Sequence, residues 1–398
     1  MINCFIPFLS LPQARQTVRA LGLCDRIKNI YLLATEKIPD EVEGCEMLMI
    51  DSPASTATFR TIALHADTAY TLLYTKYTAF EPGQFAFERL LAIAGDTNAG
   101  MLYADRYLLK NGNSQQAPVI DYQKGSLRDD FDFGSLLFFR SSVLKQAVRA
   151  MDADYRFAGL YDLRLRVSEL AELVHVNEYL YSEVETDIRK SGEKLFDYVD
   201  PKNRAVQIEL EAVCTAYLKR VGGYLAPDFE PVTFDAGGFE QEASVIIPVR
   251  NRIRTIEDAI RSVLAQKTTF RFNLIIVDNH STDGTSEAIG KYTADGRVVH
   301  LVPERSDLGI GGCWNVGVHH PACGKFAVQL DSDDVYSGPD TLQKIVDAFY
   351  EQNCAMVVGT YRMTDFKMNE IPPGIIDHRE WTLENGRNNA LRINGLGA

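Results

Sequence analysis

The stretch Phe326-Ala327-Val328-Gln329-Leu330, followed by Asp331-Ser332-Asp333-Asp334, decides the fold of the second half of this chain. The five apolar-rich residues predict a short strand. Because side chains alternate along a strand, Asp331 and Asp333 are expected on one face at its carboxyl end, where open α/β sheets bind ligands. Two carboxylates that close repel each other unless a cation lies between them, and carboxylate oxygens suit Mg²⁺ or Mn²⁺. An acidic turn that only ends a strand is the alternative interpretation.

The size and composition of the chain limit its class. With 398 residues it is long enough for two domains and a linker. A formal net charge of −13 argues against non-specific binding of nucleic acid, which needs a basic surface. The seven cysteines are scattered without a C-x-x-C pair, which favours reduced thiols in a cytoplasmic protein over a zinc site. No apolar run approaches the ~18 residues of a transmembrane helix.

Short apolar strands alternate with helical patterns in the second half. Strands are predicted at residues 243–248, 274–277, 298–302 and 326–330, and a helix is expected to begin at Thr255 with Asp258 in a capping-box arrangement. Such alternation predicts an α/β fold with a doubly wound, mainly parallel sheet.

The first half repeats this plan. Its predicted strands are residues 4–7, 29–33, 47–50 and 70–74, and a helix follows Ser10. Aligning Pro82 with Pro339 sets Tyr74, Lys76 and Tyr77 against Asp331, Asp333 and Asp334. Each half then continues into a helix and a further strand, at residues 100–103 and 355–358. We interpret this as a tandem duplication. Between the halves lie a predicted helix at 201–220 and a Pro/Gly-punctuated linker.

Three motifs follow one another in the second half: 244–251 (S-V-I-I-P-V-R-N), 276–285 (I-V-D-N-H-S-T-D-G-T) and 331–334 (D-S-D-D). In this order and spacing, residues 243 to about 360 resemble the inverting family 2 glycosyltransferases of the GT-A fold. The resemblance implies that a nucleoside-diphosphate sugar is held at its base and ribose by Pro248, Val249, Arg250, Asn251, Asp278 and Asn279. It also implies that Asp331, with Ser332 beside it, contacts the donor. Asp333, together with Asp331, would then serve the Mn²⁺ or Mg²⁺ ion on the diphosphate.

Other segments depart from the family pattern. The glycine-rich stretch 308–315 has Trp314 where an arginine is common, and we interpret it as a turn with close helix packing. Asp283 is expected to be structural, at the start of a helix. An inverting transfer needs a carboxylate that takes the acceptor's proton. The resemblance implies an acidic pair for this role, and none precedes Ala398, so we expect the general base beyond it in a longer protein.

The first half lacks the same chemistry. Tyr74 and Lys76 occupy the metal positions, and Gly159 and Leu160 stand where the family has its acidic pair. Lys76 would either meet a phosphate directly or lie on the surface as an ordinary lysine. This half is therefore predicted to be a degenerate glycosyltransferase-like domain that binds or scaffolds without catalysis.

These observations predict three regions: a degenerate domain at 1–190, a helical segment and linker at 191–240, and a donor-binding domain at 241–398 whose sheet is incomplete at its C-terminal end. The predicted function is inverting transfer of a sugar from a nucleoside-diphosphate sugar to a glycan or lipid-linked glycan acceptor in bacterial surface polysaccharide synthesis. Peripheral membrane association stays open. A silent carbohydrate-binding or scaffold protein and a sugar nucleotidyltransferase are the alternatives, although the second normally begins with a glycine-rich basic loop that Pro248–Asn251 does not provide.

Overall fold

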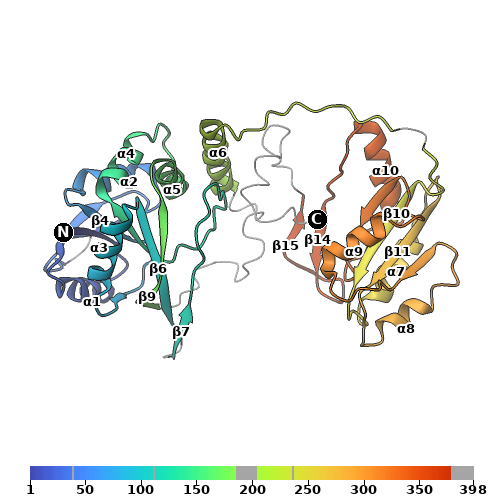
Figure 1. Ribbon diagram of the computed structural model, residues 1–398, viewed down its shortest axis with the longest axis horizontal. Coiled ribbons are helices and arrows are strands. Elements are labelled where there is room, and N and C mark those ends of the chain that lie inside the picture. The colour runs from blue at the N-terminus through green and yellow to red at the C-terminus, as the bar shows by residue number, and fades with distance from the viewer. Residues whose placement is uncertain (38–39, 111–112, 185–203, 235–236, 378–398) are drawn as a thin grey trace. The chain divides into compact units, whose positions relative to one another are not determined.

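The computed structural model describes residues 1–37, 40–110, 113–184, 204–234 and 237–377. The chain forms two compact units, one made mainly of Met1–Pro227 and the other mainly of Asp228–Tyr361 (Figure 1). Each unit is built around its own sheet.

The strands of the first unit form a nine-stranded sheet. They are β1 (Ile2–Pro7), β2 (Ile27–Ala34), β3 (Glu46–Met49), β4 (Tyr70–Tyr74), β5 (Phe80–Pro82), β6 (Met101–Lys110), β7 (Asn113–Ala117), β8 (Leu136–Arg140) and β9 (Leu173–Val184). The order is β3-β2-β1-β4-β8-β6-β9-β5, with β7 paired to β6. Strands β3, β2, β1 and β4 are parallel, whereas β8 is antiparallel to both β4 and β6.

Helices pack on both faces of this sheet because its central strands are apolar on both sides. Cys4 and Ile6 of β1 belong to one core and Phe5 to the other. The helices are α1 (Leu11–Gly22), α2 (Thr56–His65), α3 (Ala86–Thr97), α4 (Ser141–Arg149), α5 (Gly159–Leu170) and α6 (Arg204–Val221). Ser10 caps α1 as its position predicted, since its hydroxyl accepts a hydrogen bond from Gln13 N (3.4 Å).

Helix α6 packs against the first unit. The sequence placed this helix between the two domains, but its side chains Val213 and Tyr217 pack against Tyr161 and Leu165 of α5. The helix therefore belongs to the first compact unit, which extends to Pro227. The predicted domain limits at 1–190, 191–240 and 241–398 stay predictions.

The second unit contains a four-stranded parallel sheet of order β12-β11-β10-β13. Its strands are β10 (Ala243–Val249), β11 (Phe272–Asp278), β12 (Val298–Leu301) and β13 (Phe326–Gln329), and its helices are α7 (Ile256–Leu264), α8 (Thr285–Gly290), α9 (Gly309–Val318) and α10 (Thr341–Gln352). Thr255 precedes α7 as predicted. Its hydroxyl does not form the predicted capping bond, however, and donates to Arg252 O instead (3.5 Å).

Helix α9 lies close to β10 through a glycine. A Cβ atom on Gly317 would stand 2.6 Å from Cγ2 of Ile246, a separation that real Cβ atoms do not reach. Close packing of this helix on the sheet thus depends on Gly317, which lies just after the glycine-rich stretch 308–315. The interpretation of that stretch itself stays a prediction.

The two units share one plan, which supports the predicted duplication. Strands β3-β2-β1-β4 and β12-β11-β10-β13 have the same order along the chain and across the sheet. Helices α3 and α10 are both 12 residues long and both end at an asparagine in the left-handed region, Asn98 (φ 54°) and Asn353 (φ 48°). The α/β class with two tandem, mainly parallel sheets is therefore confirmed.

The predicted strand at 355–358 is absent from the structure, which has instead a hairpin of β14 (Tyr361–Thr364) and β15 (Glu370–Ile376). In the first unit the matching residues, Met101 and Leu102, are in a strand because β8 pairs with them. Among the described residues of the second unit no strand fills that place. An apolar run becomes a strand only when a partner satisfies its backbone groups.

No helix within the described residues has the length and apolar character that a membrane span requires.

Candidate functional site

Three strands of the second unit end side by side. In the parallel register, Val249 of β10 lies opposite Asp278 of β11, and Ile246 of β10 lies opposite Gln329 of β13. Leu330 N extends the pairing by donating to Ile246 O (3.1 Å). The loops that follow the three strands therefore meet at one edge of the sheet, where open α/β sheets place their ligands.

The first two loops are fastened to each other around Asn251. Its backbone N donates to Ser281 Oγ (3.0 Å), and its side-chain Oδ1 accepts a hydrogen bond from Thr282 N (2.8 Å). Asn251 lies in the left-handed region (φ 54°), which asparagine tolerates better than most residues. Asn251, predicted to bind the sugar donor, thus links the two loops and fixes their shape; we call these hydrogen bonds the clasp. Its contact with a donor stays a prediction.

Asp283 adds to this clasp. Its carboxylate accepts hydrogen bonds from Ile253 N (3.2 Å) and from Thr285 N (3.1 Å) at the start of α8. The structural role expected for it is what the geometry shows.

Asp278 is fully buried, and its carboxylate is engaged within the loop. Oδ1 accepts from Ser281 N (2.9 Å), while Oδ2 accepts from the Ser286 hydroxyl and lies 3.5 Å from His300 Nε2. Burial alone would raise the pKa of this carboxyl, but the interactions with His300, Ser281 and Ser286 outweigh it and hold the pKa well below its usual value. A contact between Asp278 and a donor stays a prediction.

Asn279 offers an unused hydrogen-bond acceptor. Its backbone N donates to Val249 O (2.8 Å), and its side chain is 6% exposed. Its Oδ1 is buried and makes no hydrogen bond to any residue that the structure describes. A buried polar atom without a partner is unfavourable by about 1–3 kcal/mol, so this atom is suited to a ligand that can donate to it.

The other predicted residues of the first loop lie in different surroundings. Pro248 and Val249 belong to β10, and both are buried. Arg250 is the first exposed residue after that strand. Of these three residues, only Arg250 is exposed to solvent.

The acidic loop differs from its predicted geometry. Strand β13 ends at Gln329, and Asp331–Asp334 form a turn in which Asp334 N donates to Asp331 O (3.1 Å). The argument from strand alternation thus does not apply to Asp331 and Asp333, because both lie beyond the last paired residue. Asp331 is half-buried, Ser332 is buried and Asp333 is exposed.

Negative charge accumulates in this turn. Although Asp334 is exposed as a residue, desolvation of its carboxyl raises its pKa, and the charges of Asp331 and Asp333 raise it further. Carboxylate oxygens of this kind fit a hard divalent cation such as Mn²⁺ or Mg²⁺. The three carboxylates do not gather within 4.8 Å of one another in the described residues, so they do not form a closed cage. Such a turn suits an ion that takes its other ligands from a bound molecule.

Arg252 is a site residue that the sequence analysis missed. Its Nε lies 3.9 Å from Asp333 Oδ2, and both side chains are about half exposed (52% and 51%). Its backbone N donates to Thr285 Oγ1 (2.9 Å), which fixes its position in the first loop. The sequence signal was present in the run Asn251-Arg252, but nothing in the sequence indicated which acid the arginine would face.

The corresponding place in the first unit is filled by its own side chains. Lys76 Nζ lies 2.5 Å from Glu183 Oε1, and Arg106 Nε lies 3.0 Å from the same oxygen. Glu183 is fully buried and also accepts from the Ser135 hydroxyl. Lys76 is therefore neither an ordinary surface lysine nor a free phosphate ligand.

Gly159 explains why the acidic-pair segment is altered in the first unit. A Cβ atom at this position would stand 2.6 Å from both Ala54 O and Thr56 N. The first residue of α5 is pressed against the chain before α2, so no acidic side chain fits there.

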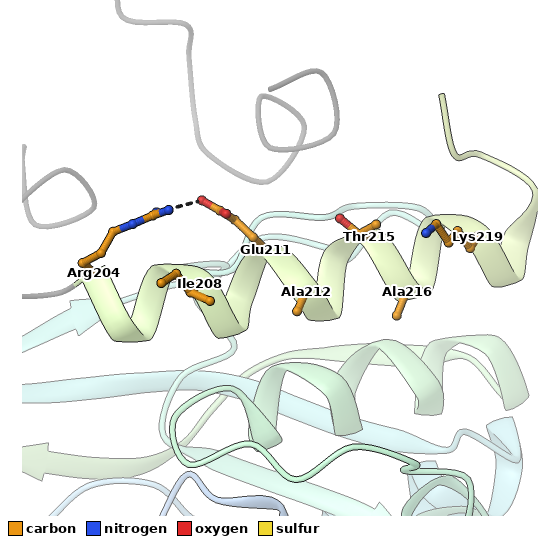
Figure 2. A pocket seen from close by; sticks show the side chains of 7 residues that line it. All are labelled: Arg204, Ile208, Glu211, Ala212, Thr215, Ala216 and Lys219. Carbon is orange, nitrogen blue, oxygen red and sulfur yellow. Dashed lines mark hydrogen bonds and ion pairs between the residues drawn. The ribbon is translucent and has the colours of Figure 1, made fainter. Parts of the chain in front are cut away.

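A surface hollow lies elsewhere, along the outer face of α6 (Figure 2). Its volume is about 400 Å³, and its lining includes Ile208, Ala212 and Ala216 between the ion pair Arg204–Glu211 (3.3 Å) and Lys219. None of the predicted donor residues lines it.

Comparison with known proteins finds a family match in the second half of the chain. Residues 244–396 match the family model described as Glycosyl transferase family 2. The chain therefore carries a family 2 glycosyltransferase domain in its second half, which confirms the resemblance found in the sequence.

Similar proteins occur in several bacteria. The chain is 33% identical over 120 residues to the putative teichuronic acid biosynthesis glycosyltransferase TuaG of Bacillus subtilis, a match that covers 30% of this chain and 46% of TuaG. It is 38% identical over 97 residues to an uncharacterized glycosyltransferase of Rickettsia conorii, covering 24% of this chain and 15% of that protein. The chain thus spans less than half the length of these two curated relatives.

Two solved structures also show similarity. One is the mannosyltransferase PcManGT from Pyrobaculum calidifontis in complex with GDP-Man and Mn²⁺, with a TM-score of 0.26, 21% identity and coverage of 43% of this chain and 47% of that one. The other is S. aureus TarS 1-349 in complex with UDP-GlcNAc, with a TM-score of 0.37, 8% identity and coverage of 55% and 72%.

Proposed function

We propose that this protein transfers a sugar from a nucleoside-diphosphate sugar to a hydroxyl group of an acceptor, with inversion at the sugar carbon. The observation that carries the proposal is the meeting of three loops, after β10, β11 and β13, at one sheet edge inside the segment that matches family 2. At this edge lie the buried Asn279 Oδ1, which has no hydrogen-bond partner among the described residues, the exposed Arg250 and the acidic turn 331–334. These groups suit a nucleobase, a phosphate and a metal ion respectively.

The roles of the residues follow from their surroundings. Asn279 Oδ1 accepts a hydrogen bond from the nucleoside, and the clasp around Asn251 holds the loops in shape for it. Asp333 and Asp331 hold Mn²⁺ or Mg²⁺, and such an ion offsets the negative charge of a leaving diphosphate. The site built from these residues is a donor site.

The biological setting is inferred from the relatives. TuaG is named for teichuronic acid biosynthesis, and teichuronic acid is a polysaccharide. This supports an acceptor that is a glycan or a lipid-linked glycan, in the assembly of a bacterial surface polysaccharide, with the donor site in the cytoplasm.

The first unit has a different proposed role. The ion pair of Lys76 with buried Glu183 occupies the place that corresponds to the acidic turn. We therefore assign this unit to scaffolding or to the binding of a partner molecule, without donor chemistry.

A thermal-shift screen tests the proposal. UDP-, GDP-, CDP-, ADP- and dTDP-sugars are each added with and without Mn²⁺, since a ligand that binds only the folded state stabilises it. We expect one nucleotide class to raise the melting temperature, and only when Mn²⁺ is present. Stabilisation by a nucleoside triphosphate with release of pyrophosphate would favour a nucleotidyltransferase instead, and no response to any nucleotide would contradict the proposal.

A further inference from the structure

Arg252 faces the acidic turn from a neighbouring strand end. Within the described residues, Asp333 has Arg252 as its ion-pair partner, and no ion pair within 4.0 Å reaches Asp331 or Asp334. Among the described residues, Asp333 is therefore the one acid of this turn with an arginine within ion-pair distance.

The ion pair between Arg252 and Asp333 is weak. Its atoms are 3.9 Å apart and both side chains are about half exposed, so solvent screens the attraction strongly. The backbone of Arg252 is fixed by its hydrogen bond to Thr285. Its guanidinium donates to Asn251 O (3.3 Å) on its own loop, the one hydrogen bond that it makes within the described part of the chain. The side chain can turn while the loop stays in place.

A divalent ion and a guanidinium compete for the same oxygen. Both are positive, so a metal ion bound to Asp333 repels the Arg252 guanidinium, whose Nε lies 3.9 Å from Asp333 Oδ2. A diphosphate changes the balance because it brings negative charge to the metal. Its oxygens also accept hydrogen bonds from the planar fork of an arginine, in pairs that a lysine cannot reproduce.

We propose that Arg252 is a switch residue, which pairs with Asp333 in the empty site and moves to the diphosphate of the donor when the metal ion binds. This inference rests on the proposed function. It makes Arg252 a positioning residue that weakens metal binding alone and strengthens metal binding with nucleotide. The two ligands then bind cooperatively, and a coupling of this kind is reciprocal.

The test uses the full chain and the nucleoside diphosphate that gives the largest thermal shift. Free Mn²⁺ is followed by electron paramagnetic resonance, with and without the nucleotide, and nucleotide affinity is measured by calorimetry at saturating Mn²⁺. In Arg252→Gln we expect Mn²⁺ alone to bind about threefold tighter, because a repelling charge is gone. The nucleotide should bind about tenfold weaker, because the arginine contacts are lost.

Two further variants make the result specific. Arg252→Lys keeps the charge but loses the paired hydrogen bonds, so we expect unchanged binding of Mn²⁺ alone and weaker binding of the nucleotide. Arg261→Gln removes the same charge from α7, where Arg261 pairs with Glu257 and Asp258, and should change neither affinity.

The outcomes separate the two ideas. If the wild-type chain binds Mn²⁺ and nucleotide but Arg252→Gln alters neither affinity, or shifts both in the same direction, the switch is wrong and the donor site stands. If the folded wild-type chain binds neither ligand, the proposed function falls, and the switch falls with it.

Discussion

The ends of β4 and β13 occupy the same place in two copies of one plan, yet their charges are arranged in opposite ways. After β4, Lys76 and Arg106 converge on a carboxylate of Glu183 that has no exposed surface. After β13, Asp333 faces Arg252 and is half exposed, while Asp331 and Asp334 have no ion pair among the described residues. The first site has neutralised itself with its own side chains, whereas the second has a surplus of negative charge that a cation can relieve.

This difference shows how one scaffold can keep a fold and lose a ligand. A buried ion cluster stabilises only when all its members are present, because each charge without its partner is strongly unfavourable in a buried position. An exposed acidic turn has the opposite property, since little stability depends on it and it remains available for binding.

The largest effect is expected from disrupting the buried ion cluster of Glu183 with Lys76 and Arg106 in the first unit. Glu183→Gln leaves Lys76 and Arg106 without their shared buried charge and should lower the free energy of unfolding by about 3 kcal/mol. Urea denaturation followed by circular dichroism measures it. Glu178→Gln, on the same strand but in an exposed pair with Arg89, is the matched control and should lower it by less than about 1 kcal/mol. Equal stability of the two variants would show that the cluster does not hold the first unit together.

Substitutions in the exposed acidic turn 331–334 should change ligand affinity and not stability. Asp333→Ala removes a proposed metal ligand and should lower Mn²⁺-dependent nucleotide affinity at least about 100-fold, while stability changes little because the side chain is half exposed. Titration calorimetry with the nucleotide identified by the screen measures it. Asp340→Ala removes an equal charge from the start of α10, where Asp340 pairs with Lys344, and should bind like the wild type. An unchanged affinity in Asp333→Ala would contradict the metal role.

Asp278 refines the comparison between the two units. It is an acid of the second unit whose buried carboxylate holds the loop together by hydrogen bonds with Ser281 and Ser286. Asp278→Asn should lower the free energy of unfolding by about 2 kcal/mol at pH 7, since the buried carboxylate loses charge-assisted hydrogen bonds from Ser281 and Ser286.

The pH dependence gives this prediction its sign. The pKa of Asp278 is lowered in the folded protein, so its contribution is complete above the ordinary aspartate pKa of about 3.9 and is lost as the pH falls toward the folded value. The stability gap between Asp278→Asn and the wild type should therefore narrow below about pH 4. A gap that stays constant from pH 7 to pH 3 would show that shape, and not charge, makes the difference.

Much of the fold was predictable because it depends on local patterns. Runs such as residues 243–248 and 274–277 are apolar and β-branched, and strands β10 and β11 lie where they indicated. The meeting of three loops at one edge also followed, since strands that alternate with helices form a parallel sheet whose carboxyl ends face one way. The internal repeat was visible from matching prolines and recurs in the paired helices α3 and α10.

Other features depended on contacts between distant residues. The apolar run at 355–358 has no strand partner among the described residues. Helix α6 packs against helix α5 and therefore lies in the first unit. The partner of Lys76 lies 107 residues away in the sequence, so no local pattern could reveal that the lysine was already paired.

The sequence by itself determined the class of this protein, because the order and spacing of three motifs and the periodicity of the apolar residues are local properties of the chain. Only the tertiary structure decided which charges are paired and which are free. It enclosed Glu183 and Asp278, left the Asn279 oxygen without a partner in the described part of the chain, and set Arg252 against Asp333. The physical reason is that burial and electrostatic pairing depend on distance in space, which folding sets and the linear order of residues does not.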